Sequence, residues 1–312
     1  MKDFKDICRM SQAELKRYME TYLNECGYKP INGDGFLYAK GSEPVLLVAH
    51  LDTVHSLKCT EIIEKDGKIS SPQGIGGDDR CGVFMIMNVV KDLHCSVILC
   101  EDEETGCKGA AKFCKTPNIK SLDVNYMIEF DRRGKNDAVF YSCDNKDFEK
   151  FVCDNTGFKF AYGSFTDISK LAPAAKIAAV NLSCGYYNPH CIEEYVVYDE
   201  MMHTVEMAKK LIVAECKKPF KYVERKFTLD NFSMFDDKYR ESIAKSTSNK
   251  RKKHVATSSF EFELELEVVI VDADGEESVV YTNGKTKAEC WADLFLSYPE
   301  VCFDMVVDYS FV

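Results

Sequence analysis

Residues 45–52 read Val-Leu-Leu-Val-Ala-His-Leu-Asp, a run of five apolar residues followed at once by a histidine and, two positions later, by an aspartate. A short run that is apolar throughout is typical of a central strand covered on both faces. Two further largely apolar runs, 96–100 and 126–130, also end at acidic residues, and the apolar spacing from 79 to about 93 is helical. Strands that alternate with helices predict an α/β protein with a mostly parallel or mixed central sheet flanked by helices.

The rest of the first 225 residues fits this pattern. The sequence Ser11-Gln-Ala-Glu14 has the form of a capping box, which predicts a helix that runs to about Cys26 and stops at Gly27. We expect further elements at 36–39 (strand), 61–69 (hairpin around Asp66-Gly67), 106–114 (helix), 177–182 (strand) and 199–216 (helix).

The chain changes character after about residue 225. Residues 245–259 are polar and basic with almost no apolar periodicity, which is typical of a linker or exposed loop. From Phe260 to Glu267 apolar and acidic residues alternate strictly, as in a half-exposed strand. A small ββαβ unit is predicted, with a turn at 272–275, a strand through 279–281, a helix near 286–296 and a final strand at 302–307. We therefore expect a large domain over 1–225, a linker over 226–259 and a small α+β subdomain over 260–312.

Composition and charge narrow the class of protein. The formal charge of −11 over 312 residues disfavours nucleic acid, because a phosphate backbone attracts a basic surface. The basic run 250–253 lies in a Ser/Thr/Asn-rich setting, as solvated linkers do. No apolar run reaches the length of a membrane helix, and the first residues lack a signal-peptide pattern. The 15 cysteines are odd in number and form no Cys-x-x-Cys pair, so we expect reduced thiols in a cytoplasmic protein without nucleic-acid or membrane partners.

Histidines and carboxylates gather where the predicted strands end. In sheets of this kind ligands bind beyond the carboxyl ends of the strands. The residues concerned are His50 and Asp52, Asp78 and Asp79 after a glycine-rich loop, Glu103 and Glu104, Asp131, and His190. Nitrogen and oxygen donors without cysteine sulfur suit a catalytic divalent ion better than a closed structural zinc site. The set therefore predicts a hydrolytic site with two metal ions.

Each of these features has a plainer explanation when it is taken alone. A histidine after an apolar strand is usually a hydrogen-bonded core residue, but Asp52 could hold the proton of the non-ligating ring nitrogen of His50. Acids near Gly106 stabilise a helix start, which does not explain four carboxylates directly after a buried strand. The loop 74–77 lacks the lysine of a phosphate-binding loop and the Rossmann spacing, so a tight turn that aims Asp78 into a cleft is favoured. The other histidines, His55 included, have no comparable setting, and we expect structural roles for them.

The ordered motifs resemble those of the co-catalytic zinc exopeptidases, the superfamily of peptidase T, the aminoacylase-like carboxypeptidases and the tetrahedral aminopeptidases. The His-x-Asp motif is similar to 50–52, and the Asp-Asp-Lys/Arg-x-Gly motif to 78–82. The motif Glu-Glu-x-Gly-x-x-Gly-Ala is complete at 103–110. Asp131 and His190 occupy the later carboxylate and terminal histidine positions, so the resemblance covers roughly residues 1–216.

The resemblance implies two divalent metal ions, zinc in the first place and cobalt or manganese as alternatives, and a role for each motif residue. Asp78 would bridge the two ions, of which His50 and Asp131 complete one and Glu104 and His190 the other. Glu103 would be the general base and acid, and Asp52 would orient His50. It further implies hydrolysis of an amide bond with a metal-bridging hydroxide as nucleophile. An aminopeptidase that acts on short peptides is the leading expectation.

The chain also departs from these relatives. Only 59 residues separate Asp131 from His190, too few for the inserted lid or dimerisation domain of some branches. Substrate contacts must then come from elsewhere. Asp167 is a candidate to bind a substrate amine, and Tyr186 or Tyr187 to donate to the oxyanion, against ordinary loop roles for all three.

Three alternatives stay open at this point. A deacylase or carboxypeptidase of the same superfamily, acting on N-acylated amino acids or peptides, would share the chemistry at the amide. A catalytically inactive binding or scaffold protein is an alternative of another class, although such a protein usually loses a ligand or the general base, and here all are present. The C-terminal unit could dock another chain through the edge of strand 260–267. The sequence gives no indication of the oligomeric state.

Overall fold

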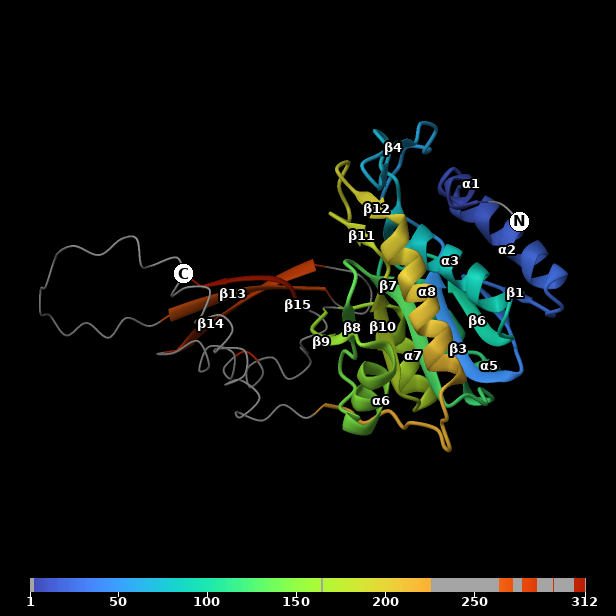
Figure 1. Cartoon of the computed structure of the whole chain (residues 1–312). Helices are drawn as coiled ribbons and strands as arrows, with labels where there is room; N and C mark the ends of the chain where they lie inside the picture. The colour runs from blue at the N-terminus through green and yellow to red at the C-terminus, as the bar shows by residue number, and fades with distance from the viewer. Residues whose placement is uncertain are drawn as a thin grey trace, which may run out of the picture. The chain divides into compact units, whose positions relative to one another are not determined.

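An eight-stranded sheet lies at the centre of the larger part of the chain, with helices on both of its faces (Figure 1). The computed structural model describes residues 3–163, 165–225, 264–271, 277–284, 294 and 306–311. The chain divides into two compact units, residues 1–224 and 225–312, and the sheet lies in the first. Within the described part of the chain, no helix is both long and apolar enough to cross a membrane.

The sheet is mixed, with its central strands parallel. In spatial order its strands are β1 (Ile31–Gly33), β2 (Phe36–Ala39), β6 (Cys95–Cys100), β3 (Glu43–His50), β7 (Tyr126–Arg132), β10 (Ala179–Ser183), β8 (Asp137–Val139) and β9 (Lys159–Ala161). Neighbours from β6 to β10 pair in parallel, whereas β1, β2 and β8 pair with their inner neighbours antiparallel. The predicted α/β class with a parallel or mixed central sheet is confirmed.

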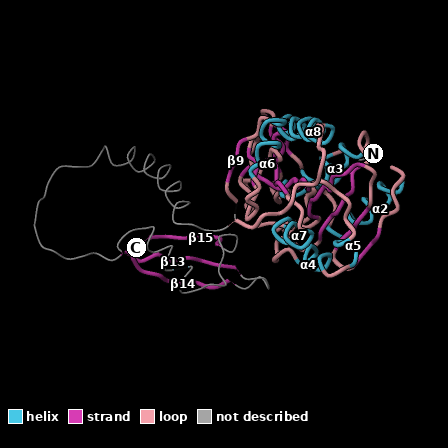
Figure 2. Tube along the Cα trace, turned by 90° about the horizontal axis from the view of Figure 1, so that it is seen from below, coloured by secondary structure: helices cyan, strands magenta, loops and turns pink. Residues whose placement is uncertain are grey.

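Alternate residues of the central strands face two different helical layers. In β3, Leu47 and Ala49 pack in one layer, and Leu46 and Val48 in the other. The first layer holds α1 (Phe4–Cys8), α2 (Gln12–Glu25), α3 (Gly77–Val90), α6 (Lys146–Thr156) and α8 (Tyr198–Val213). The second holds α4 (Lys108–Cys114), α5 (Pro117–Lys120) and α7 (Asp167–Ala175), and Figure 2 shows both layers. Because both faces are covered, β3 is apolar from Val45 to Ala49 and ends at His50.

A smaller sheet lies beside the start of α3 and carries the last of the candidate ligands. Its strand order is β11-β12-β5-β4, with β11 at Tyr186–Tyr187, β12 at Tyr195–Val197, β5 at Lys68–Ser70 and β4 at Ile63–Lys65. Strands β4 and β5 confirm the hairpin that the turn Asp66-Gly67 predicts. Through β12 this hairpin is paired with the segment that contains His190, so two segments far apart in the sequence meet here.

The second unit contains a three-stranded antiparallel sheet in its described residues. Its order is β14 (Glu277–Gly284), β13 (Leu264–Val271) and β15 (Val306–Phe311). In β13, Leu266, Val268 and Ile270 are buried. The described parts of β13 and β15 overlap the predicted strands 260–267 and 302–307, and β14 contains the predicted strand 279–281. The linker, the turn at 272–275 and, apart from Leu294, the helix near 286–296 lie outside the described residues.

Candidate metal centre

His50 stands at the end of β3 with its two ring nitrogens facing different carboxylates. It is buried, with 1% of its surface exposed. Its Nε2 lies 3.0 Å from Asp78 Oδ1 and 3.6 Å from Asp131 Oδ1, whereas its Nδ1 lies 3.2 Å from Asp52 Oδ1. In metal-ligating histidines the N–H of the ring nitrogen that does not bind the metal usually donates a hydrogen bond to a carboxylate in this manner. The arrangement therefore suits His50 as a ligand through Nε2.

Asp52 joins two of the motifs. Besides facing His50, its Oδ1 accepts a hydrogen bond from the backbone amide of Glu103, and its Oδ2 from that of Glu104, both at 3.0 Å. Burial alone would raise its pKa, but the hydrogen bonds from His50 and from the two amides hold the pKa of Asp52 below its usual value. The charged carboxylate thus fixes both the imidazole and the Glu103–Glu104 turn.

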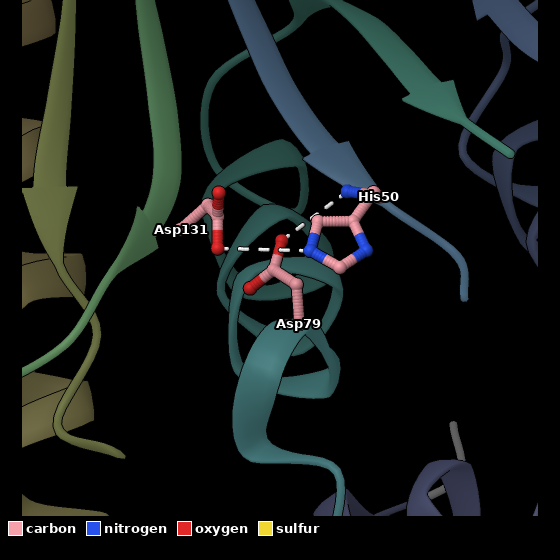
Figure 3. Close-up of side chains that lie close together, drawn as sticks. All are labelled: His50, Asp79 and Asp131. Carbon is pink, nitrogen blue, oxygen red and sulfur yellow. Dashed lines mark hydrogen bonds and ion pairs between the residues drawn. The ribbon is translucent and has the colours of Figure 1, made fainter. Parts of the chain in front are cut away.

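The neighbours Asp78 and Asp79 have different surroundings at the start of α3. Asp78 turns Oδ1 to His50 and Oδ2 to His190, whose Nε2 lies 3.3 Å away. Asp79 is fully buried, and its two oxygens accept hydrogen bonds from the backbone amides of His50 (3.2 Å) and Gly82 (2.8 Å). Figure 3 shows Asp131 facing a ring nitrogen of His50 and Asp79 facing the backbone nitrogen of the same residue. Asp78 is therefore the carboxylate that lies between the two imidazoles.

His190 and Glu104 complete the second half of this arrangement. His190 Nε2 lies 3.2 Å from Glu104 Oε2, and the imidazole is half-exposed in a loop after β11. The other oxygen of Glu104, Oε1, is buried without a hydrogen-bond partner among the described residues. The hydrogen bonds to Asp78 and then to Glu104 raise the pKa of His190 to about 11. The pair of carboxylates thus attracts positive charge strongly.

Asp131 is held in place by three residues from other elements. Thr166 Oγ1 donates to its Oδ2 at 2.7 Å, Asn181 Oδ1 accepts from its amide at 2.8 Å, and the Tyr186 hydroxyl lies 3.3 Å from its Oδ1. Burial, and then the charge of Asp78, raises the pKa of Asp131 to about 6. This carboxylate is therefore oriented by the fold rather than by solvent.

Glu103 is half-buried next to the ligands. Its Oε1 accepts a hydrogen bond from the Cys107 thiol at 3.3 Å. Burial, followed by the charges of Asp131, Asp167 and Glu104 and against the opposing effect of His50, raises the pKa of Glu103 well above its usual value. A carboxyl group with a raised pKa can both accept and return a proton near neutral pH.

The three candidate substrate-binding residues have other contacts. Asp167 is fully buried at the start of α7, and neither of its oxygens has a hydrogen-bond partner among the described residues. Tyr186 is buried against Asp131, and the Tyr187 hydroxyl donates to Glu200 at 2.6 Å. The polar atoms of Asp167 are enclosed and the tyrosine hydroxyls face other residues, and amine binding by Asp167 and oxyanion donation by the tyrosines stay predictions.

Sequence reasoning missed several residues that shape the site. Thr166 and Asn181 hold Asp131, and Glu194 with His55 contacts the loop before Asp78. Asn181 carried a detectable signal, since it interrupts the apolar strand Ala-Val-Asn-Leu-Ser. The other three have no local signal, because their partners are distant in the sequence.

The donor set fits divalent metal ions. There are three groups in which one potential ligand atom from each residue lies within 4.8 Å of the others. They are His50, Asp79 and Asp131; His50, Glu103 and Glu104; and Asp78, Glu104 and His190. Imidazole nitrogens with carboxylate oxygens suit zinc, cobalt or manganese. Glu104 Oε1 has no partner among the described residues, and the pKa values of Asp131 and His190 are raised. Both features are expected of a site that binds positive charge.

Chelator-treated protein should lose stability as the pH rises from about 5 to about 8. Burial raises the pKa of Asp167 to about 7, and that of Asp131 is about 6, both above the ordinary aspartate value. The folded state then binds more protons than the unfolded state over this range, so stability is greatest at the acidic end and falls as these groups ionise. Thermal unfolding in chelator at a series of pH values measures this.

The matched variant for this experiment is Asp167→Asn. It removes one buried ionisation and should flatten the dependence of unfolding temperature on pH. A rise in stability of the chelator-treated protein between pH 5 and pH 8 would contradict the expectation.

The eight-stranded sheet with helices on both faces is the zinc-exopeptidase fold, which an aminopeptidase and a tripeptidase of known structure share. Residues 37–166 match the model of peptidase family M28, a segment that contains the motifs from His50 to Asp131 and ends before His190. Together these findings confirm the resemblance that the motifs indicate. No curated protein matches the sequence.

Solved structures with this fold differ widely in sequence from the chain. Aminopeptidase PepT of Bacillus cereus is 13% identical with a TM-score of 0.56, over 67% of this chain and 96% of that one. A tripeptidase of Staphylococcus aureus is 12% identical with a TM-score of 0.57, over 67% and 95%. Glutaminyl cyclase of Bacteroides thetaiotaomicron is 13% identical with a TM-score of 0.53, over 68% and 96%. Because one of these is a cyclase, the fold alone does not fix the reaction.

Proposed function

We propose that the protein is a metal-dependent exopeptidase, an aminopeptidase that hydrolyses short peptides with two divalent metal ions. The observation that carries this proposal is the position of Asp78. Its Oδ1 lies 3.0 Å from His50 Nε2 and its Oδ2 3.3 Å from His190 Nε2, and each histidine faces a further carboxylate, Asp131 or Glu104. One carboxylate between two histidine–carboxylate pairs suits two ions held close together.

The remaining residues of the site would serve proton transfer and orientation. Two divalent ions bound there would supply Lewis-acid activation of a water molecule and of the substrate carbonyl. Glu103 would take the proton of the attacking water and return it to the leaving amine, which its raised pKa permits. Asp52 would keep His50 in the tautomer that ligates through Nε2, since it faces Nδ1.

The alternatives differ in which end of the substrate is recognised. A deacylase or carboxypeptidase would use the same residues at the amide, and a scaffold protein would use none of them. Against the scaffold stands the assembly of both histidines, the carboxylates and Glu103 at one edge of the sheet, with donor atoms within 4.8 Å in each group. The names of the similar aminopeptidase and tripeptidase favour the aminopeptidase over the other two.

Metal analysis combined with a substrate panel tests the proposal. Metal content per chain is measured after loading with zinc, cobalt or manganese, and hydrolysis is compared for peptides with free termini, N-acetylated peptides and C-terminally amidated peptides. We expect about two ions per chain and cleavage that requires a free amino terminus but tolerates amidation. Cleavage of N-acetylated peptides but not of amidated ones would assign the deacylase or carboxypeptidase instead. Bound metal without hydrolysis of any member would refute the peptidase assignment.

A further inference from the structure

The glycine-rich loop before Asp78 surrounds a carboxylate that belongs to the protein itself. Glu194 is fully buried. Its Oε2 accepts a hydrogen bond from the amide of Gly76 at 3.0 Å, and its Oε1 from the amide of Asp78 at 2.9 Å. Backbone amides at the start of a helix bind anions well, and here they bind a side chain rather than a phosphate.

His55 completes the surroundings of this carboxylate. Its Nε2 lies 2.9 Å from Glu194 Oε2. Gly74 has φ of +85°, and a Cβ there would meet the His55 ring at 2.2 Å. The loop therefore needs glycine at position 74, because its backbone is left-handed and His55 approaches it closely.

Three ligand-bearing segments meet at Glu194. The loop of Gly76 leads directly into Asp78, His55 follows His50 by five residues, and Glu194 itself follows His190 by four. Glu194 also directly precedes β12, which lies beside β11 and near the start of α3 (Figure 1). One buried side chain thus ties together the segments of the bridging carboxylate and of both histidines.

We infer that Glu194 is a positioning residue that sets Asp78 and His190 for the ion completed by Glu104. This inference rests on the proposed metal centre. His50 and Asp131 are held by strands β3 and β7 of the central sheet, whereas His190 lies in a loop whose neighbour Glu194 is buried. Loss of the Glu194 contacts should therefore weaken one ion more than the other.

Metal titration of Glu194→Gln tests this inference. Glutamine has the shape of glutamate but only one acceptor oxygen, so it cannot accept from both Gly76 and Asp78 without placing its amide group against a donor. We expect the affinity for one of the two ions to fall by about 10–100-fold, the range for groups that orient metal ligands. Calorimetric titration with zinc should then resolve two ions, of which one is weakened clearly more than the other. Excess zinc should restore kcat.

Two further variants keep the test decisive. Glu193→Gln changes the same charge on an exposed neighbour and should leave both affinities unchanged. His55→Leu removes the contact with Glu194 Oε2 and should weaken the same ion to a smaller degree, which carries the test if Glu194→Gln does not fold. A lower unfolding temperature with two unchanged affinities would overturn the inference and leave a stabilising role alone. Because the readout is metal affinity, a wild type that binds two ions without cleaving peptides refutes only the proposed function.

Discussion

Replacing Asp78 by asparagine should remove more metal and more activity than a change at any terminal ligand. Its two oxygens face His50 Nε2 and His190 Nε2, so each half of the site depends on one oxygen of this carboxylate. Asparagine is neutral, and its amide group would meet one half as a donor. We expect metal affinity to fall by on the order of 100-fold or more, above the range for groups that merely orient ligands. Metal content after dialysis and kcat/KM measured at limiting metal give the effect.

The matched control is Asp79→Asn, one residue further along. Asp79 accepts from the backbone amides of His50 and Gly82, and burial raises its pKa well above the usual value. Asparagine there would leave one buried amide without an acceptor, which costs about 1–3 kcal/mol of folding stability. Metal content should stay near that of the wild type. If instead Asp79→Asn lost both ions while Asp78→Asn kept them, the bridging role would belong to Asp79.

The central strands could be predicted from sequence because their signal is local. In β3, β6 and β7 nearly every residue is buried, so the strands are apolar runs that stop where the site begins. The strands β8 and β9 have three residues each and are defined by partners distant in the sequence, so they leave no pattern. The strands at this edge of the sheet are therefore determined by tertiary pairing and not by the local sequence pattern.

The missed helices show the same limit in a different form. Helix α6 had usable signals, an Asn145 cap and Gly157 at its end, but few apolar residues between them. Helix α7 contains Pro173, a residue that local rules count against a helix interior. Burial of Ile168 and Leu171 against the sheet outweighs those local preferences.

The candidate site was predictable as a set of residues but not as a geometry. The motif spacing selects Asp78 and Asp79 as candidates equally. Only the fold shows that Asp78 faces the imidazoles and that Asp79 accepts from backbone amides. Tyr186 and Tyr187 illustrate the same point. Neighbours on a strand point to opposite sides, so one is buried against Asp131 and the other reaches Glu200. Proximity in sequence to a ligand therefore does not place a side chain in the site.

Replacing Glu103 by glutamine should abolish turnover while both metal ions remain bound. The pKa of this half-buried carboxyl is raised, and its Oε1 accepts from the Cys107 thiol, which leaves the group oriented for proton transfer. Glutamine keeps the size of the side chain but can neither take a proton from water nor return one to the leaving amine. Loss of a general base and acid typically lowers kcat by about 10²–10⁴-fold. Steady-state kinetics with metal analysis of the same sample measures both quantities.

The adjacent residue supplies the contrast, because Glu104→Gln changes the same charge one position later. Glu104 Oε2 lies 3.2 Å from His190 Nε2, so this variant should lose affinity for one ion and regain activity when metal is added in excess. Glu103→Gln should show no such recovery, since its defect is in proton transfer rather than in metal binding. Recovery of Glu103→Gln with added metal would make Glu103 a ligand, and retention of a large share of wild-type kcat would remove it from the chemistry. The two variants thus separate holding the metal from moving the proton in a pair of carboxylates that the sequence places side by side.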